Sequence, residues 1–428
     1  MLPTIYFHTF GCRLNQGETS VLEGLFKAEG FPIASQKEHA QIFVINTCTV
    51  TAKGDLDTRK LIHQIIRINS QAQIALIGCQ SQTQKNELFT HPNIRWVVGN
   101  AHKMELVNII KKSLNNQAPM LIVDNIPKHA FTIPVTEHSR KHTRANIKIQ
   151  DGCNYFCSYC EVPYARGRSR SRLFDNIMEE AKQLAQNGYK EIILTGVNTG
   201  TYSYENKNLL DVIKALSTIP GIERIRISSI EPQTVDLKIF EFMAQNDKLC
   251  HHLHTPAQSC NDRILKAMNR VYTFKEFENF ISLVIQMVPG IGIGTDIIVG
   301  FPGETDEEFE DTYVKLSKLP LSYIHVFSYS PRKLAKSKDL PNPIAPAIIK
   351  KRSQKILQLS LAKREHFFSS LLHQSIPVLF EQQKSGIWSG LTSQYVRVLV
   401  KSNDNLKNKI VPVHLEKIEG QNMIGRIF

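Results

Sequence analysis

The chain has 428 residues, of which 42% are hydrophobic and 21% are charged, so it can build well-packed cores in two or three domains. This composition excludes a globally disordered protein. Lys and Arg outnumber Asp and Glu by 52 to 39, which gives a formal net charge of +13 and favours a polyanionic partner.

The amino-terminal stretch MLPTIYFHTF lacks the basic start and the long apolar region of a signal peptide. Elsewhere, no stretch reaches the roughly 18 to 20 apolar residues that a membrane span needs. We therefore predict a cytoplasmic protein that has no contact with a membrane. Because cytoplasmic thiols stay reduced, we interpret the eight cysteines as metal ligands, reactive thiols or packing groups rather than disulfides.

Residues 1–116 alternate short apolar runs with amphipathic stretches, which is typical of a parallel sheet covered by helices. The expected strands are 4–10, 41–47, 73–78 and 94–100, and the expected helices are 17–29, 53–68 and 102–114. We predict a doubly wound α/β domain here. A basic, proline-containing linker is expected at 117–143.

A second alternation of strands and helices occupies residues 144–372. The expected strands are 145–150, 191–198, 224–232, 251–258, 292–303 and 323–331, with helices such as 175–187 and 304–318 between them and a long helix at 345–372. Six such units are too few for an eight-fold barrel. They predict a partial (β/α)6 TIM-type barrel, whose active site lies at the carboxyl ends of its strands.

Residues 373–428 change to short alternating strands separated by Gly and Asn turns. The expected strands read IPVLFEQ, YVRVLV, IVPVHL and MIGRIF. This pattern predicts a small β-barrel of nucleic-acid-binding type, and the alternative is a structural cap on the larger barrel.

Cys153, Cys157 and Cys160 form a C-x3-C-x2-C motif directly after an expected strand. A structural zinc site would need a fourth Cys or His nearby, and a c-type haem motif would end in Cys-His, whereas Glu161 follows here. Three thiolates on a four-iron cluster leave one iron without a protein ligand, and a small molecule can bind there. The motif predicts such a cluster; another iron–sulfur or zinc loop is the alternative.

This motif, with Tyr159 before its last cysteine, resembles that of the radical S-adenosylmethionine superfamily. The resemblance implies a [4Fe-4S] cluster that binds S-adenosylmethionine and cleaves it reductively to a radical able to attack an unactivated C–H bond. Polar groups at strand ends would then contact the cofactor. The candidate cofactor-binding residues are Tyr159, Thr195, Gly196, Glu231 and Asp296. For Asp296, a buried and hydrogen-bonded structural carboxylate is an equal alternative.

Cys12, Cys48 and Cys79 each follow an expected strand of the N-terminal domain. Because the carboxyl ends of parallel strands share one edge of the sheet, we expect these three thiols to converge. Taken singly, each would be an ordinary small buried residue.

The flanking sequences resemble the radical S-adenosylmethionine methylthiotransferases over essentially the whole chain. The matching stretches are TFGCRLNQGET, INTCTVTAKGDLDTRK, IGCQ, SSIEP and DIIVGFPGETDEEF, together with the cysteine triplet. The resemblance implies that Cys12, Cys48 and Cys79 hold an auxiliary [4Fe-4S] cluster that carries sulfur. It also implies that residues 373–428 are similar to the TRAM RNA-binding domain.

Within that family, NTCTVT and CRLNQ are most similar to the branch that acts on N6-threonylcarbamoyladenosine at position 37 of tRNA. The alternatives are the branches that modify isopentenyladenosine-37 or an aspartate of a ribosomal protein. The implied reaction joins a methylthio group to adenine C2, with one S-adenosylmethionine methylating the sulfur and another supplying the radical. No acid/base pair is required.

The implied partners are the tRNA anticodon stem-loop, an electron donor such as flavodoxin or ferredoxin, and a sulfur source. Two rival interpretations remain open. One is a radical enzyme with a single cluster that performs another reaction on RNA. The other is a non-catalytic RNA-binding protein with a structural metal.

Four arginines, Arg166, Arg168, Arg170 and Arg172, recur at alternate positions after the cysteine triplet. Guanidinium groups suit phosphates and carboxylates, and a threonylcarbamoyl group ends in a carboxylate. We predict that one of them contacts that carboxylate or the nearby tRNA backbone; a solvated run of charges is the alternative.

Some residues depart from the family pattern. Cys260 stands where the family usually has glycine, and Gly17 stands where it often has tyrosine. Cys250 lies in a histidine-rich stretch in which His252 and His254 share one face of a strand. We interpret these two histidines as polar residues inside the barrel rather than as metal ligands.

Overall fold

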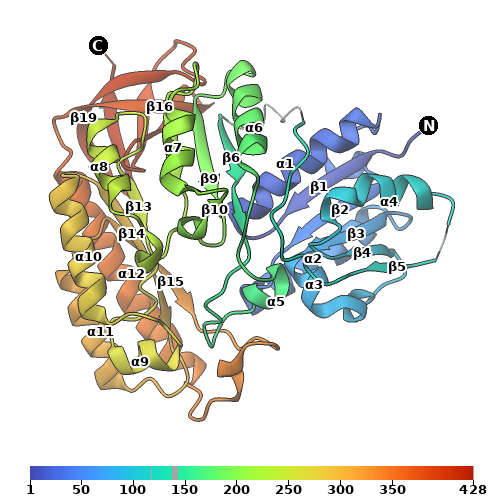
Figure 1. Ribbon diagram of the computed structural model, residues 1–428, viewed down its shortest axis with the longest axis horizontal. Helices are drawn as coiled ribbons and strands as arrows, with labels where there is room; N and C mark the ends of the chain where they lie inside the picture. Colours follow the sequence, from blue (N-terminus) through green and yellow to red (C-terminus); the bar gives the residue numbers. More distant parts are fainter. Residues whose placement is uncertain (117, 137–142, 428) are drawn as a thin grey trace.

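The computed structural model describes residues 1–116, 118–136 and 143–427, and Figure 1 shows three domains in chain order. The N-terminal domain, drawn in blue and cyan, lies beside a large α/β barrel in green to orange. A small red β-barrel caps one end of that larger barrel.

The N-terminal domain is a five-stranded parallel sheet in the order β1-β2-β3-β4-β5. Its strands are β1 (Ile5–Thr9), β2 (Ile42–Thr47), β3 (Gln73–Gly78), β4 (Ile94–Val98) and β5 (Met120–Ile122). Its helices are α1 (Arg13–Ala28), α2 (Ala52–Ile68), α3 (Cys79–Gln84) and α4 (Leu106–Ser113). The strand β5 lies within residues 117–143, which were expected to be linker. It is too short, at three residues, for its alternation to be recognised.

Helices cover both faces of this sheet, as predicted. Phe26 of α1 and Ile110 of α4 pack with Val44 on one face, whereas Ile65 of α2 packs with Ile45 on the other. The whole of β2 is buried, which explains why its sequence is a continuous apolar run rather than an alternation.

The second domain contains six parallel strands in two sheets, β12-β9-β6 and β13-β14-β15. Its barrel strands are β6 (Arg144–Lys148), β9 (Glu191–Thr195), β12 (Arg224–Ile227), β13 (His252–His254), β14 (Gly292–Val299) and β15 (Tyr323–Ser328). A bridge between Ile225 and Leu249 joins the two sheets. The predicted partial barrel of six strands is confirmed.

Helices and short hairpins surround this barrel. The helices are α5 (Val162–Arg166), α6 (Phe174–Gln186), α7 (Leu209–Ser217), α8 (Lys238–Gln245), α9 (Asp262–Ala267), α10 (Phe274–Met287), α11 (Asp306–Lys318) and α12 (Pro346–Ser369). The short strands are β7 (Gln150–Asp151), β8 (Arg170–Ser171), β10 (Ser203–Tyr204) and β11 (Lys207–Asn208). The helices α10 and α11 begin with complete capping boxes at Thr273 and Thr305, which fix where each helix starts.

The C-terminal domain is a closed barrel in the order β16-β17-β18-β20-β19. Its strands are β16 (Ser375–Lys384), β17 (Ile387–Thr392), β18 (Arg397–Lys401), β19 (Ile410–Glu419) and β20 (Asn422–Arg426). The strand β17 was not among those expected, because Gly390 interrupts its alternation. This glycine is needed there, since a Cβ atom on it would lie 2.6 Å from the carbonyl oxygen of Leu379.

Two buried arginines of β12 dock the C-terminal barrel onto the larger one. Arg224 donates to two of its backbone carbonyls at 2.8 and 2.7 Å, and Arg226 donates to two more at 2.9 and 3.1 Å. The accepting carbonyls belong to Leu391, Pro377, Ser393 and Thr392. Arg226 also pairs with Glu191 at 2.8 Å. The C-terminal barrel is therefore fixed to the larger barrel rather than tethered to it.

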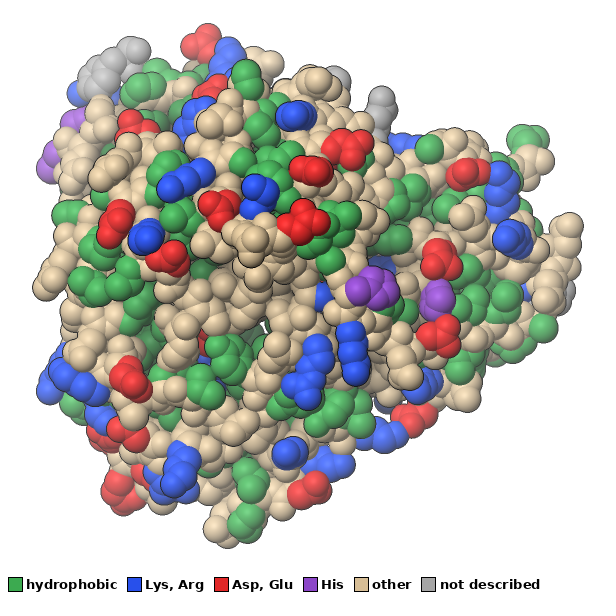
Figure 2. All heavy atoms as spheres, in the orientation of Figure 1, with side chains coloured by type: hydrophobic (Ala, Val, Ile, Leu, Met, Phe, Trp, Pro, Cys, Tyr) green, Lys and Arg blue, Asp and Glu red, His purple; other side chains and the backbone are tan. Residues whose placement is uncertain are grey.

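The charges on the face shown in Figure 2 are mixed, with Lys and Arg side chains standing among Asp and Glu. The positive net charge is therefore not gathered into a single patch on this face. Among the helices of the described residues, none combines the length and the apolar character that crossing a bilayer requires.

Candidate active site

The three isolated cysteines of the N-terminal domain lie at the carboxyl edge of its sheet. Cys12 immediately precedes α1, Cys48 follows β2, and Cys79 is the first residue of α3. The backbone brings two of their loops into contact, because a Cβ atom on Gly11 would lie 2.7 Å from the Cys48 sulfur. Burial, with the neighbouring Cys79 and Cys12 thiols, raises the pKa of Cys48 to about 12. The structure thus gathers these three thiols at one edge.

The second set of cysteines lies on the loop between β7 and α5. The backbone N–H of Cys160 donates to the Cys157 carbonyl at 3.0 Å, and that of Val162 donates to the Cys160 sulfur at 3.4 Å. Burial, and after it the nearby Cys157 thiol, raises the pKa values of Cys153 and Cys160. All three thiols are free. Three closely spaced soft donors on one loop fit an iron–sulfur cluster.

The two sets of cysteines lie on elements that pack against each other. The helix α3, which begins at Cys79, packs on α5, which follows Cys160. The Asn100 side-chain amide donates to the Ala165 carbonyl at 2.7 Å and lies 3.8 Å from the Cys79 sulfur. In Figure 1, α3 and α5 meet at the boundary between the N-terminal domain and the barrel. The candidate site therefore lies between these two domains.

Arg270 connects the second cysteine loop to the barrel. Its Nη1 lies 3.4 Å from the Cys157 sulfur and 3.1 Å from Glu231 Oε1, and its Nη2 donates to the other oxygen of Glu231. Burial opposes the guanidinium charge, but Tyr159 and Glu231 more than offset this, so the pKa of Arg270 is raised. Sequence reasoning missed Arg270, because nothing in MNRVYT distinguishes it from a surface arginine.

The other cofactor candidates at this end of the barrel have structural partners. Tyr159 packs on a small apolar cluster that includes Met268. The Thr195 hydroxyl donates to the Ile147 carbonyl at 3.0 Å. A Cβ atom on Gly196 would lie 2.8 Å from the Gln150 side-chain oxygen, so a larger residue there would require Gln150 to shift. Their contact with a cofactor stays a prediction.

Asp296 belongs to a polar network inside the barrel. Its Oδ1 lies 3.0 Å from His254 Nε2 and 3.3 Å from His325 Nδ1, and His254 Nδ1 lies 3.1 Å from the Tyr323 hydroxyl. Burial raises the pKa of Asp296, but the hydrogen bonds from both histidines outweigh burial and lower it. The ligand atoms of these three residues lie within 4.8 Å of one another. Their mutual hydrogen bonds account for this proximity.

The alternate arginines occupy different environments. Arg166 is buried and donates to Asn15 at 2.6 Å, to Asp151 at 3.0 Å and to Glu18 at 3.1 Å. Arg172 is fully buried and pairs with Glu180. The guanidinium groups of both residues are therefore already engaged by protein carboxylates.

The remaining two arginines are closer to solvent. Arg168 is exposed, and its guanidinium lies 4.3 Å from the centre of the Phe156 ring. Arg170 is partly exposed and pairs with Asp151 at 3.2 Å. Of the four, Arg168 has the side chain that a polyanion can reach most easily.

The residues that depart from the family pattern have packing roles. Cys260 lies in the barrel core, and Cys250 is likewise buried. A Cβ atom on Gly17 would lie 3.3 Å from the Asn146 carbonyl oxygen, so glycine lets α1 lie directly on β6. His252 is buried and its Nε2 lies 2.9 Å from the Tyr323 hydroxyl.

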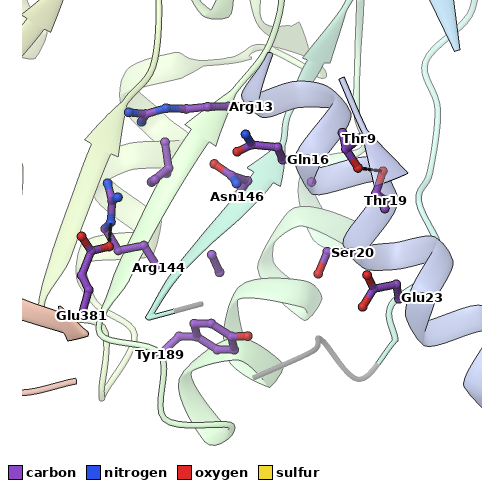
Figure 3. Close-up of a pocket in the computed structure, with 13 residues that line it drawn as sticks. Thr9, Arg13, Gln16, Thr19, Ser20, Glu23, Arg144, Asn146, Tyr189 and Glu381 are labelled. Carbon is purple, nitrogen blue, oxygen red and sulfur yellow. Dashed lines mark hydrogen bonds and ion pairs between the residues drawn. The ribbon is translucent and has the colours of Figure 1, made fainter. Parts of the chain in front are cut away.

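A polar cavity of about 300 Å³ lies beside α1 and the first half of β6. Figure 3 shows Arg13, Gln16 and Asn146 around it, with the Arg144–Glu381 ion pair at its side. The Asn146 side-chain oxygen is buried and has no hydrogen-bond partner among the described residues. This cavity is suited to ordered water.

Two family profiles match the chain. The radical SAM superfamily profile matches residues 147–316, and the profile of an uncharacterized protein family, UPF0004, matches residues 4–99. The second of these profiles spans Cys12, Cys48 and Cys79, and the first spans Cys153, Cys157 and Cys160.

Curated relatives match over nearly the full length. The chain is 34% identical to the threonylcarbamoyladenosine tRNA methylthiotransferase MtaB of Bacillus subtilis, covering 97% of this chain and 94% of the relative. It is 38% identical to the protein of the same name from Aquifex aeolicus, over 85% and 89%. A tRNA-2-methylthio-N(6)-dimethylallyladenosine synthase of Protochlamydia amoebophila is 30% identical, over 99% and 96%.

Among solved structures, the radical S-adenosylmethionine methyltransferase TsrM from Kitasatospora setae, solved with cobalamin and a [4Fe-4S] cluster, has a similar fold. It superposes with a TM-score of 0.57 at 18% identity, covering 77% of this chain and 75% of that one. This similarity concerns the fold alone.

Proposed function

Because this chain belongs to the radical S-adenosylmethionine methylthiotransferases, we propose that it joins a methylthio group to C2 of N6-threonylcarbamoyladenosine at position 37 of tRNA. The observation that carries the proposal is the meeting of two sets of three free thiols at one domain boundary. The substrate assignment is supported by the 34% and 38% identity to relatives named for that nucleoside, against 29% to 32% for relatives named for dimethylallyladenosine.

The family uses S-adenosylmethionine and [4Fe-4S] clusters, and the thiols present suit them. Cys153, Cys157 and Cys160 would hold the cluster that cleaves the cofactor, and Cys12, Cys48 and Cys79 would hold the auxiliary cluster. When bound, these groups supply the radical that removes hydrogen and the sulfur that replaces it.

The protein's own residues bind, orient and shield these groups. Arg270 holds Cys157 against Glu231, which fixes the cysteine loop on the barrel. Cys48 and Cys79 are buried, whereas Cys12 is exposed, so a substrate base would approach the auxiliary set from the side of Cys12. The burial of Cys48 and Cys79 would limit side reactions with water.

Contacts with tRNA and with the supporting partners belong to the same proposal. The exposed Arg168, next to the partly exposed Arg170, would contact the substrate carboxylate or the tRNA backbone. The C-terminal barrel would act as a TRAM-like domain that binds the anticodon stem-loop. An electron donor such as flavodoxin or ferredoxin and a separate sulfur source would serve the clusters.

The substrate is tested by mass spectrometry of tRNA nucleosides from cells with and without this gene. The expected result is 2-methylthio-N6-threonylcarbamoyladenosine in the first sample and only the unmodified threonylcarbamoyladenosine in the second. Threonylcarbamoyladenosine that stays unmethylthiolated in both would refute the assignment.

The role of the N-terminal cysteines is tested by Cys48→Ala. After anaerobic reconstitution, the variant is expected to keep about four of about eight irons. It should still cleave S-adenosylmethionine reductively, because Cys153, Cys157 and Cys160 are intact, but methylthio insertion should be lost. A variant that keeps the full iron content and inserts the methylthio group normally would contradict the ligand assignment.

A further inference from the structure

Three buried polar side chains, Thr49, Glu161 and Arg332, meet between the N-terminal domain and the barrel. They are 1%, 5% and 6% exposed. Thr49 directly follows Cys48 in the chain, and Glu161 directly follows Cys160. One small cluster of side chains therefore lies one residue away from a member of each cysteine set.

The contacts within this cluster form a closed triangle. The Thr49 hydroxyl donates to Glu161 Oε2 at 2.6 Å and accepts from Arg332 Nη2 at 3.0 Å, while Arg332 Nε lies 3.4 Å from the same Glu161 oxygen. A buried hydrogen bond to a charged group is strong and directional. The triangle therefore restrains the backbones of both cysteine loops relative to each other.

The segment after β15 extends this restraint. The backbone N–H of Leu334 donates to the second oxygen of Glu161 at 2.8 Å, and Arg332 Nη1 pairs with Asp55 of α2 at 2.9 Å. The hydroxyl of Ser330 accepts from the N–H of Ala52, the first residue of α2, at 3.0 Å. Residues 330–334 thus hold the loop after Cys160 and the start of α2 at the same time.

We propose that Thr49, Glu161 and Arg332 form a positioning cluster that sets the separation between the two cysteine sets. This inference rests on the proposed function and deepens it. Radical chemistry at one set must meet sulfur carried by the other, and a misplacement of about 1 Å between reacting groups can cost about 100-fold in rate. The three residues act through the cysteine loops and contact no reacting atom.

The test is Glu161→Ala in the full-length, reconstituted enzyme. Methylthio product should fall about 10- to 100-fold, the usual effect of losing an outer partner of a metal ligand loop. Iron content and reductive cleavage of S-adenosylmethionine should be retained, so that more 5′-deoxyadenosine is formed per methylthio group inserted. A purely structural loss would lower both activities together.

A second readout needs no loaded enzyme. In the unloaded full-length protein, amide hydrogen exchange of residues 48–52 and 161–166 should be faster in Glu161→Ala than in the wild type, while the barrel core is unchanged. If wild-type enzyme makes no methylthio nucleoside, the proposed function fails, whereas the exchange result still decides whether the cluster restrains the two loops.

A matched control comes from the neighbouring residue. Lys333 pairs with Glu87 across the same domain boundary, but both side chains are more than half exposed. Because exposed ion pairs contribute little, Lys333→Ala should leave product yield and exchange near the wild type. Thr49→Ser, which keeps the hydroxyl, should retain the wild-type coupling between cofactor cleavage and methylthio insertion. Thr49→Val, which lacks the hydroxyl, should lose this coupling.

The inference is overturned if Glu161→Ala keeps the wild-type ratio of 5′-deoxyadenosine to methylthio product, or if Lys333→Ala uncouples the enzyme equally. Should Glu161→Ala fail to fold, Arg332→Lys takes its place, because it keeps the charge and removes the donors that reach Thr49 and Glu161. Normal coupling in both Arg332→Lys and Thr49→Val would also overturn it.

Discussion

Two arginines only two positions apart, Arg166 and Arg168, have opposite environments. Arg166 is buried against Asn15, Glu18 and Asp151. Burial opposes its charge, but Cys79, Glu18 and Asp151 more than offset this and keep the pKa of Arg166 well above the ordinary value. Arg168 is exposed. The sequence places both in one run of basic residues, and only the fold separates an internal counter-charge from a residue that can reach a polyanion.

The exposed position leads to a prediction about tRNA binding. Arg168→Ala should weaken binding and reduce the slope of log affinity against log salt by about one, because one phosphate contact is lost. Filter binding of tRNA at several salt concentrations measures this slope. Arg168→Lys keeps the charge and should keep the slope; an unchanged slope in Arg168→Ala would show that this residue makes no phosphate contact.

At the scale of elements, the turn from β3 into α3 depends on one glycine. Gly78 has a φ of +97°, and a Cβ atom on it would lie 2.5 Å from the Asn46 side-chain oxygen and 2.7 Å from the Thr47 carbonyl oxygen. The next residue is Cys79. The position of this thiol is therefore set by a backbone conformation that only glycine adopts without strain.

A non-glycine residue with a left-handed backbone lowers the free energy of unfolding by roughly 1–2 kcal/mol. Gly78→Ala should lower it by more than this, because the added methyl group also clashes with the Thr47 backbone. Gly290→Ala is the matched control, since Gly290 has a φ of +77° but open space around its Cβ position. Urea unfolding gives both free energies, and iron analysis of reconstituted protein should show a loss only for Gly78→Ala. Equal destabilisation by the two substitutions would contradict the steric argument.

The predicted elements match the structure where hydrophobic periodicity is long enough to be read. Five of the six barrel strands and the long helix α12 fall within their expected ranges, and β6 begins at Arg144, one residue before its expected start. The strands β5 and β17 were not predicted. The strand β5 has only three residues, and Gly390 breaks the alternation of β17. Cysteine spacing predicted the thiol set at 153–160, and position after a strand predicted the other set. Arg270 and Arg332 could not be found, since their carboxylate partners Glu231 and Glu161 lie 39 and 171 residues away in sequence.

At the scale of the whole molecule, Arg226 docks the C-terminal barrel through two backbone carbonyls and also pairs with the buried Glu191 of the larger barrel. Arg226→Gln should lower the free energy of unfolding by about 3 kcal/mol, because it leaves Glu191 buried with weaker partners, Arg144 at 3.8 Å and Arg224 at 4.0 Å. Thermal unfolding measures this loss, and limited proteolysis after α12 should become faster.

The control for this substitution lies on the surface of the same small barrel. Lys417→Gln removes an exposed pair with Glu419 and should change stability by less than about 1 kcal/mol. Proteolysis after α12 at the wild-type rate in Arg226→Gln would show that docking does not depend on this arginine.

The way in which this small barrel is held also affects how the protein can evolve. Arg224 and Arg226 donate hydrogen bonds to backbone carbonyls, which every amino acid has. These contacts therefore do not depend on which side chains the docked domain carries. Its outer surface is therefore free to acquire new sequence, while the distance between that surface and the cysteine-lined site is inherited unchanged.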